Sequence, residues 1–141
     1  MPRTDRYLQH LAAVPMFQAC SRHELQTMGR LAENYKVDAG TVLVREGRRE
    51  DEFYLIIDGS AKVTRGGKKI ATLGPGDYFG ELAVLIPGPR NATVTATSPS
   101  ELLGISSRDF WALATEVPAI LRSVLVGTAR RLHQADGRTI R

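Results

Sequence analysis

Cysteine, histidine and long apolar runs are all scarce in this sequence of 141 residues. Cys20 is the only cysteine, which excludes an internal disulfide and a cysteine-based metal cluster; we interpret it as a small buried hydrophobic residue. The three histidines, His10, His23 and His133, all fall in predicted helices. A histidine-rich metal site inside a barrel is therefore not expected, and no Ser-His-Asp or paired-acid constellation stands out. An enzyme, a metal and a cofactor are all disfavoured.

No apolar run approaches the length of a membrane-spanning helix, and the opening MPRTDRYLQH lacks the apolar core of a secretory signal. We therefore expect a cytoplasmic protein with no membrane partner. The composition, 43% hydrophobic and 24% charged, is typical of a globular protein. A chain of this length can bury a substantial core, so we expect residues 1–141 to form a single domain.

The net charge of +4 raises the question of nucleic-acid binding. The basic residues are scattered in small groups, and acidic residues lie beside the first group. We interpret these groups as solvated turns and a solvated terminus, so binding to DNA is not expected. The groups are Arg45-Arg48-Arg49, Arg65-Lys68-Lys69 and Arg130-Arg131-Arg138-Arg141.

Helical spacing marks both ends of the chain, residues 1–34 and 107–134. Ser21 and Glu24 form the pattern of a capping box at a helix start. Pro118 suits the first turn of a C-terminal helix, which is followed by a tail at 135–141. The apolar face of that helix is broad, so we expect part of it to pair with a second copy in a homodimer. Its predicted stripe is Leu121, Leu125, Thr128 and Leu132, with Val117, Ile120 and Val124 beside it.

Between residues 35 and 106 short β-like runs alternate with turn residues. Asp58-Gly59 and Gly66-Gly67 supply the positive φ angles that tight hairpins require. This texture predicts an antiparallel sandwich or barrel. The runs are KVD, TVLVRE, EFYLIID, AKVTR, KKIATL, NATVTATS and ELLGIS.

The segment 79–94, FGELAVLIPGPRNATV, keeps one acid and one base among glycines, prolines and small apolar residues. The turn at Gly76-Asp77 and the breaker Pro87-Gly88-Pro89 leave room for a short helix at 80–85, whose free N–H groups would favour an anion. Arg90 adds a planar fork suited to phosphate, and Glu81 can accept hydrogen bonds from hydroxyls beside that anion. Together they predict a sugar-phosphate site. The alternative is an internal salt bridge between Glu81 and Arg90.

The same segment resembles the phosphate-binding cassette of cyclic-nucleotide-binding domains. That cassette runs Phe-Gly-Glu-Leu-Ala, a short spacer, then Pro-Arg-x-Ala-Thr-Val, and this chain matches it at 79–83 and 89–94. The resemblance extends from Pro15-Met16-Phe17 to ARRL at 129–132, and so covers nearly the whole chain. It implies an eight-stranded antiparallel, jelly-roll-like β-roll with N-terminal helices, a short cassette helix and a C-terminal helical lid.

The resemblance also implies a ligand, cyclic AMP or cyclic GMP, and a role for each matching residue. Glu81 corresponds to the acceptor of the ribose 2′-hydroxyl and Arg90 to the clamp on the cyclic phosphate. Asp136, near the end of the lid, is the candidate base contact and would accept from the amine of adenine. Asn91 departs from the Ala or Thr usual in the family, so it bears on the choice of purine. The remaining predicted ligand-binding residues are Gly80, Leu82, Ala83, Ala92 and Thr93.

These inferences predict a stand-alone cyclic-nucleotide sensor whose C-terminal helix moves on binding and acts on an effector protein that the sequence does not name. Two alternatives stay open. The β-roll could be a degenerate scaffold for protein contacts. The chain could also be a regulator without a DNA-binding domain, since it ends shortly after ARRL, where catabolite-activator-like members continue into a helix-turn-helix.

Overall fold

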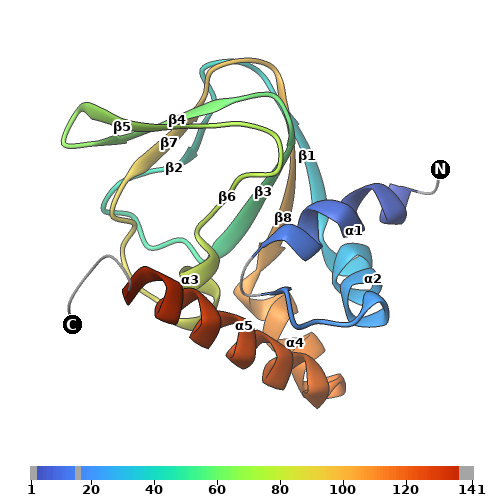
Figure 1. The fold of residues 1–141 in the computed structure, drawn as a ribbon. Helices are drawn as coiled ribbons and strands as arrows, with labels where there is room; N and C mark the ends of the chain where they lie inside the picture. The colour runs from blue at the N-terminus through green and yellow to red at the C-terminus, as the bar shows by residue number, and fades with distance from the viewer. Residues whose placement is uncertain (1–2, 15–16, 137–141) are drawn as a thin grey trace. The chain divides into compact units, whose positions relative to one another are not determined.

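The computed structural model describes residues 3–14 and 17–136 of the chain. They form two compact units, one of residues up to Leu31 and from Arg108 onward, the other of Ala32–Ser107. The first unit is helical, whereas the second consists of β-strands and one short helix (Figure 1).

Eight antiparallel strands build the second unit. They are β1 (Glu33–Val37), β2 (Val42–Val44), β3 (Glu52–Asp58), β4 (Ala61–Arg65), β5 (Lys68–Leu73), β6 (Tyr78–Phe79), β7 (Thr93–Ala96) and β8 (Ser100–Ser106). One sheet has the order β1-β8-β3-β6 and the other β2-β7-β4-β5. The short helix α3 (Glu81–Leu85) follows β6. The predicted eight-stranded antiparallel β-roll with a short cassette helix is confirmed.

The core of the β unit lies between its two sheets. Ile56 and Leu102 come from the first sheet, and Val44, Ala61 and Val94 come from the second. All five are nearly inaccessible to solvent. The alternation in AKVTR explains how β4 contributes, because Ala61 is buried in this core while the next residue along the strand faces solvent.

Glycine is required at both turns that the sequence marked, but only the second joins a hairpin, because β4 pairs with β5 whereas β3 and β4 lie in different sheets. Gly59 has a φ of 100°, and a Cβ at this position would collide with the side chain of Ser100. Gly66 and Gly67, between β4 and β5, have φ of 58° and 81°. Side chains rarely adopt this left-handed region, so the positive φ angles are confirmed at these three glycines, whereas the hairpin predicted at Asp58-Gly59 is wrong and the turn there connects the two sheets.

The helical unit contains α1 (Arg3–Ala13), α2 (Arg22–Leu31), α4 (Ser107–Glu116) and α5 (Pro118–Asp136). The capping box at the start of α2 is present: Ser21 N donates to Glu24 Oε1 at 2.7 Å, and Glu24 N donates to Ser21 Oγ at 3.1 Å. Ser123 Oγ, from α5, lies 3.3 Å from the same carboxylate oxygen. Cys20 is half-buried rather than fully buried as predicted, and burial, together with the nearby Glu24, raises the pKa of its thiol to about 12.

The broad apolar face predicted for α5 is only partly buried. Ile120 and Val124 are buried, whereas Leu121 and Leu125 are 40% and 69% exposed. Residues four apart share a helix face, so both pairs satisfy the same periodicity, and spacing alone does not tell which pair faces the core. The described part of the helix therefore buries one stripe and leaves a second apolar stripe in solvent.

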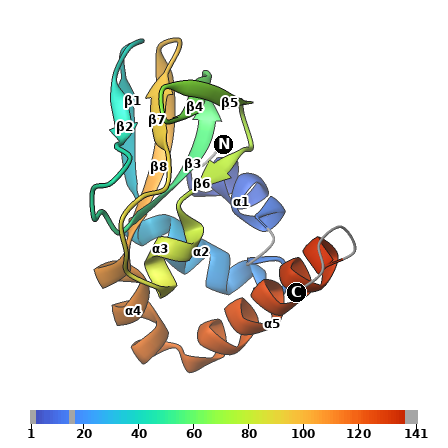
Figure 2. The ribbon, with the colours of Figure 1, turned by 90° about the vertical axis from the view of Figure 1, so that its left-hand side faces the viewer.

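Among the described residues, no single helix is long and apolar enough to cross a membrane. Only α4 and the first ten residues of α5, taken together, have the required length and hydropathy. That pair is bent by 119° at its junction (Figure 2).

Candidate functional site

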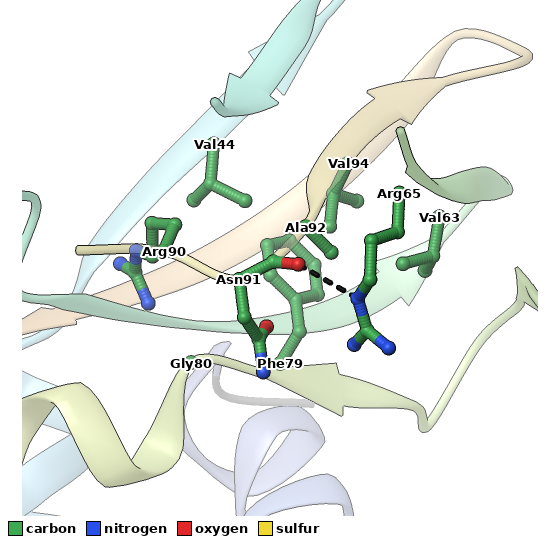
Figure 3. Close-up of a pocket in the computed structure, with 9 residues that line it drawn as sticks. All are labelled: Val44, Val63, Arg65, Phe79, Gly80, Arg90, Asn91, Ala92 and Val94. Atoms are coloured by element: carbon green, nitrogen blue, oxygen red, sulfur yellow. Dashed lines mark hydrogen bonds between the residues drawn. The ribbon is translucent and has the colours of Figure 1, made fainter. Parts of the chain in front are cut away.

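A pocket of about 160 Å³ lies in the β unit, beside the segment 79–94. Its walls are mainly apolar, and two arginines stand on opposite sides of it in Figure 3. Its lining residues are Val44, Val63, Arg65, Phe79, Gly80, Arg90, Asn91, Ala92 and Val94. Four of the residues predicted to bind a ligand, at positions 80, 90, 91 and 92, therefore share one cavity.

The backbone of Arg90 is held on both sides by the loop that follows β2. Arg90 N donates to the carbonyl oxygen of Arg48, and Gly47 N donates to that of Arg90, both at 2.8 Å. Pro89 and Arg49 form an isolated antiparallel bridge next to these bonds. The turn around Pro87 thus returns the chain to the rim of the pocket, and the arginine is placed by backbone pairing.

The guanidinium of Arg90 is turned into the protein, and the residue is only 9% exposed. Its Nη2 donates to the backbone carbonyl oxygen of Glu52, at the start of β3. Its Nε is buried and has no hydrogen-bond partner among the residues that the structure describes. A buried cation is costly unless its donors are satisfied, so this side chain is suited to receive an anion.

Gly80 makes room for that guanidinium. Its φ of 81° is one that side chains rarely adopt, and a Cβ here would collide with Nη1 of Arg90. The same Cβ would lie 3.1 Å from the carbonyl oxygen of Glu52. Gly80 was predicted to allow close approach by a ligand, and it also allows close approach by Arg90 itself.

Four other predicted site residues have side chains that the structure describes, and two of them line the pocket. Asn91 is exposed at the pocket, and Ala92 is buried in its wall. Thr93 Oγ1 instead accepts from the backbone N of Glu46 at 2.9 Å, so its hydroxyl holds a loop. The backbone N of Ala83 donates to the carbonyl oxygen of Gly80 at 3.1 Å and so belongs to the first turn of α3.

Three predicted residues have side chains outside the described part of the chain. Glu81 and Leu82 are the first two residues of α3 by their backbone, and Asp136 is the last residue of α5. The structure therefore does not test the interpretation of Glu81 as a ribose acceptor or its alternative as the salt-bridge partner of Arg90. It does not test the base contact at Asp136 either.

A cluster of hydrogen-bonded side chains around Glu52 was not predicted from the sequence. Its carboxylate accepts from the hydroxyls of Tyr35 at 2.8 Å and Tyr54 at 3.0 Å. Burial first, and then the Glu52 carboxylate, raise the pKa of both tyrosines above the usual range. Tyr54 also stacks on Phe79, with ring centroids 5.3 Å apart. The cluster supports the pocket wall, because the backbone of Glu52 holds Arg90 while its side chain holds two strands.

Arg65 is the second residue that the sequence analysis did not place in the site. Its Nε donates to the backbone carbonyl oxygen of Asn91 at 2.8 Å (Figure 3). The only sequence signal was a basic residue directly before the Gly66-Gly67 turn, and that pattern is more typical of a solvated hairpin end. In the described part of the chain, no group of three or more His, Cys, Asp and Glu residues could hold a metal ion.

Residues 35–116 match the family model described as cyclic nucleotide-binding domain. The chain is 41% identical over 113 residues to the Pycsar effector protein PaPycTIR of Pseudomonas aeruginosa, covering 79% of this chain and 36% of that protein. It is 36% identical over 110 residues to the cAMP-dependent protein kinase regulatory subunit of Yarrowia lipolytica, covering 77% of this chain and 29% of that protein. The chain thus spans about a third of the length of these curated relatives.

The fold is similar to that of the N-terminal domain of a transcriptional regulator from Streptomyces coelicolor A3(2). The TM-score is 0.83 at 26% identity, over 93% of this chain and 94% of that chain. The family match covers more than half of the sequence and includes the whole segment that lines the pocket. From the sequence match, the fold and the pocket together, we conclude that the chain belongs to the cyclic nucleotide-binding domain family.

Proposed function

We propose that this chain is a sensor module that binds cyclic AMP or cyclic GMP in the Arg90 pocket and passes the signal to a partner through α5. The observation that carries the proposal is the buried guanidinium of Arg90, whose Nε has no partner among the described residues. A cyclic phosphate carries one negative charge and several acceptor oxygens. It would neutralise the arginine and accept from the free donor.

The sugar and its surroundings are assigned to the rest of the cassette. Glu81 follows Gly80 directly, and its carboxylate would accept from the ribose 2′-hydroxyl. Leu82, Ala83 and Ala92 would contribute backbone and packing contacts. Thr93 would act indirectly, because its hydroxyl holds the Glu46 amide beside the pocket. Asn91, exposed at the pocket, would face the phosphate or the base edge.

The output of the module is assigned to α5. Leu121 and Leu125 leave an apolar stripe in solvent, which would contact an effector protein or a second copy in a homodimer. Asp136 would meet the base from the end of this helix. The relatives include an effector protein and a kinase regulatory subunit, and the match covers only about a third of the length of each, which supports regulation of a partner. We place this activity in the cytoplasm.

A thermal shift distinguishes a sensor from a scaffold that does not bind nucleotide. Ligand at about 100 times its Kd stabilises a folded domain by roughly 2.7 kcal/mol, which raises Tm by several degrees at this size. We expect that shift with cyclic AMP or cyclic GMP, and no shift with adenosine or guanosine, which lack the phosphate. An unchanged Tm with both cyclic nucleotides at millimolar concentration would favour the scaffold.

A further inference from the structure

Two basic turns that are well separated in the sequence are neighbours in the β unit. One is the loop after β2, and the other joins β4 to β5. The carboxylate of Glu46, in the first turn, accepts from the amide of Gly66, in the second, at 3.1 Å, although 20 residues separate them. The contact unites two basic groups that the sequence placed in separate solvated turns. We call their exposed cations the basic patch: Arg45, Arg48, Arg49, Lys68 and Lys69.

The first turn of the basic patch adjoins the Arg90 pocket. Val44 lines the pocket, and Arg45 follows it directly in the chain. Further along the same loop, the carbonyl oxygen of Arg48 accepts from the backbone N of Arg90 at 2.8 Å. Arg49 forms an isolated antiparallel bridge with the residue before Arg90. The loop therefore carries its three exposed cations next to the proposed phosphate site.

The second turn of the basic patch adjoins the same pocket. Lys68 is paired with Arg65, which lines the pocket, in the ladder between β4 and β5. Lys69 is paired with the residue before Arg65. None of the five cations of the patch is itself among the residues that line the pocket. The patch thus surrounds the site with positive charge without contributing to its walls.

The charge pattern of the patch favours a small anion over an extended polyanion. Three acids, Glu46, Glu50 and Asp51, lie among the arginines of the first turn. They would oppose a nucleic-acid backbone, whose affinity comes from direct contacts of many phosphates with cations. Attraction at a distance depends instead on the excess of positive charge, and it extends over about 10 Å at 0.1 M salt and about 30 Å at 0.01 M. Such fields concentrate a charged ligand at a cleft and raise its association rate.

We propose that the basic patch steers the anionic phosphate of the ligand into the Arg90 pocket. The patch then sets the rate constant of association, kon, while Arg90 and the pocket walls set the rate constant of dissociation, koff. This division follows from position, because charges at the edge of a site act mainly on kon and buried, hydrogen-bonded charges act mainly on koff. The inference rests on the proposed function, and it assigns a kinetic role to cations that do not contact the bound ligand.

Stopped-flow binding tests the inference with the cyclic nucleotide, AMP or GMP, that binds more tightly, carrying a fluorophore at C8 of its purine. Lys68→Glu combined with Lys69→Glu should lower kon about fivefold at an ionic strength of roughly 10 mM and less than about twofold at 0.5 M, where the field is screened. Its koff should stay within about twofold of wild type. A koff that rises as much as kon falls would overturn the inference, because it would show that the lysines contact the bound ligand.

A second pair of substitutions tests the other turn. Arg45→Glu combined with Arg48→Glu should also lower kon about fivefold at low salt. The variant with all four substitutions should lower kon by about the product of the two effects, because charges that act through the field are nearly additive. An unchanged kon at low salt in either pair would overturn the inference. The Tm of each variant without ligand shows that it is folded.

A matched control separates the local patch from the net charge of the chain. Lys36→Glu makes the same change in net charge as Lys69→Glu alone, but Lys36 is exposed on β1, at the edge of the first sheet opposite β6. Lys69→Glu should lower kon about twofold at low salt, and Lys36→Glu should leave it nearly unchanged. Equal slowing by both would overturn the inference. If wild type binds neither cyclic nucleotide, the proposed function itself fails, and the inference fails with it.

Discussion

Arg90 and Gly80 depend on each other, although ten residues separate them in the chain. The guanidinium occupies the space that a side chain at residue 80 would need, and the backbone at residue 80 adopts a φ of 81°. Both requirements act on the same residue. Glycine at this position is therefore needed for stability and for the shape of the pocket.

Gly80→Ala should weaken both folding and ligand binding. The left-handed backbone alone costs about 1–2 kcal/mol for a residue with a Cβ, and displacement of Arg90 should weaken cyclic-nucleotide binding as well. Urea unfolding and titration calorimetry measure the two effects. Gly88→Ala is the matched control, because Gly88 lies in the same segment and a Cβ there would contact nothing within 4 Å. A Gly80→Ala protein with the stability and affinity of wild type would contradict this account of Arg90.

At the scale of the strands, Glu52 connects elements that the sequence keeps apart. Its carboxylate lies over Gly104 of β8, where a Cβ would come within 2.6 Å of Oε2, and it bonds Tyr35 of β1 and Tyr54 of β3. The order β1-β8-β3 makes this contact across the middle strand possible. The cluster thus supports the sheet whose edge strand, β6, leads into Gly80.

The tyrosines of this cluster predict a decline of stability in alkali. Burial and Glu52 hold the pKa of Tyr54 above its usual value of about 10, so above that pH the folded state binds more protons than the unfolded state. The stabilisation is therefore complete below pH ~10 and is lost as pH rises beyond it. Tyr54→Phe should lower the free energy of unfolding by about 1 kcal/mol at pH 8 and flatten its decline above pH ~10.

Urea unfolding of wild type and Tyr54→Phe between pH 8 and 11 measures this difference. The comparison cancels the titration of lysines, which both proteins share. Tyr35→Phe should behave in the same way, since its hydroxyl bonds the other oxygen of the same carboxylate. Parallel curves for wild type and both variants throughout this pH range would show that the hydroxyls contribute nothing.

At the scale of the whole molecule, the proposed signal should appear as a change in α5. If bound nucleotide draws this helix into a defined lid, hydrogen exchange in residues 118–134 should slow, because a state sampled part of the time becomes dominant. Exchange in α2 serves as the internal reference. Unchanged exchange in α5 at saturating ligand would contradict the lid, and sedimentation as a monomer with and without ligand would contradict the homodimer.

Much of the fold could be predicted because turn residues and capping residues act locally. Ser21 and Glu24 marked a helix start three residues apart, and the Gly66-Gly67 pair marked the β4–β5 hairpin. The two-residue strand β6 has no alternation to detect, so the residue pattern alone showed seven strands and the family resemblance supplied the eighth. On α5, periodicity did not tell the buried stripe from the exposed one.

The cassette was the predictable part of the site, because its residues lie close together in the sequence. Arg65 and Glu52 were not predictable, since their partners are distant: Arg65 bonds a carbonyl 26 residues away, and Glu52 bonds a tyrosine 17 residues away. Such contacts depend on strand order and register, which a single sequence does not specify. Both residues are charged, and charged residues at strand ends are usually solvated.

The central claim is that Arg90 binds the phosphate of a cyclic nucleotide, and titration calorimetry of Arg90→Ala tests it most directly. The control is Arg108→Ala, which removes the same charge from an exposed position. We predict that wild type and Arg108→Ala bind cyclic AMP or cyclic GMP alike, while Arg90→Ala loses about 100-fold or more in affinity, as expected for a lost charge-assisted contact of several kcal/mol. Binding by folded Arg90→Ala within about threefold of wild type would contradict the claim.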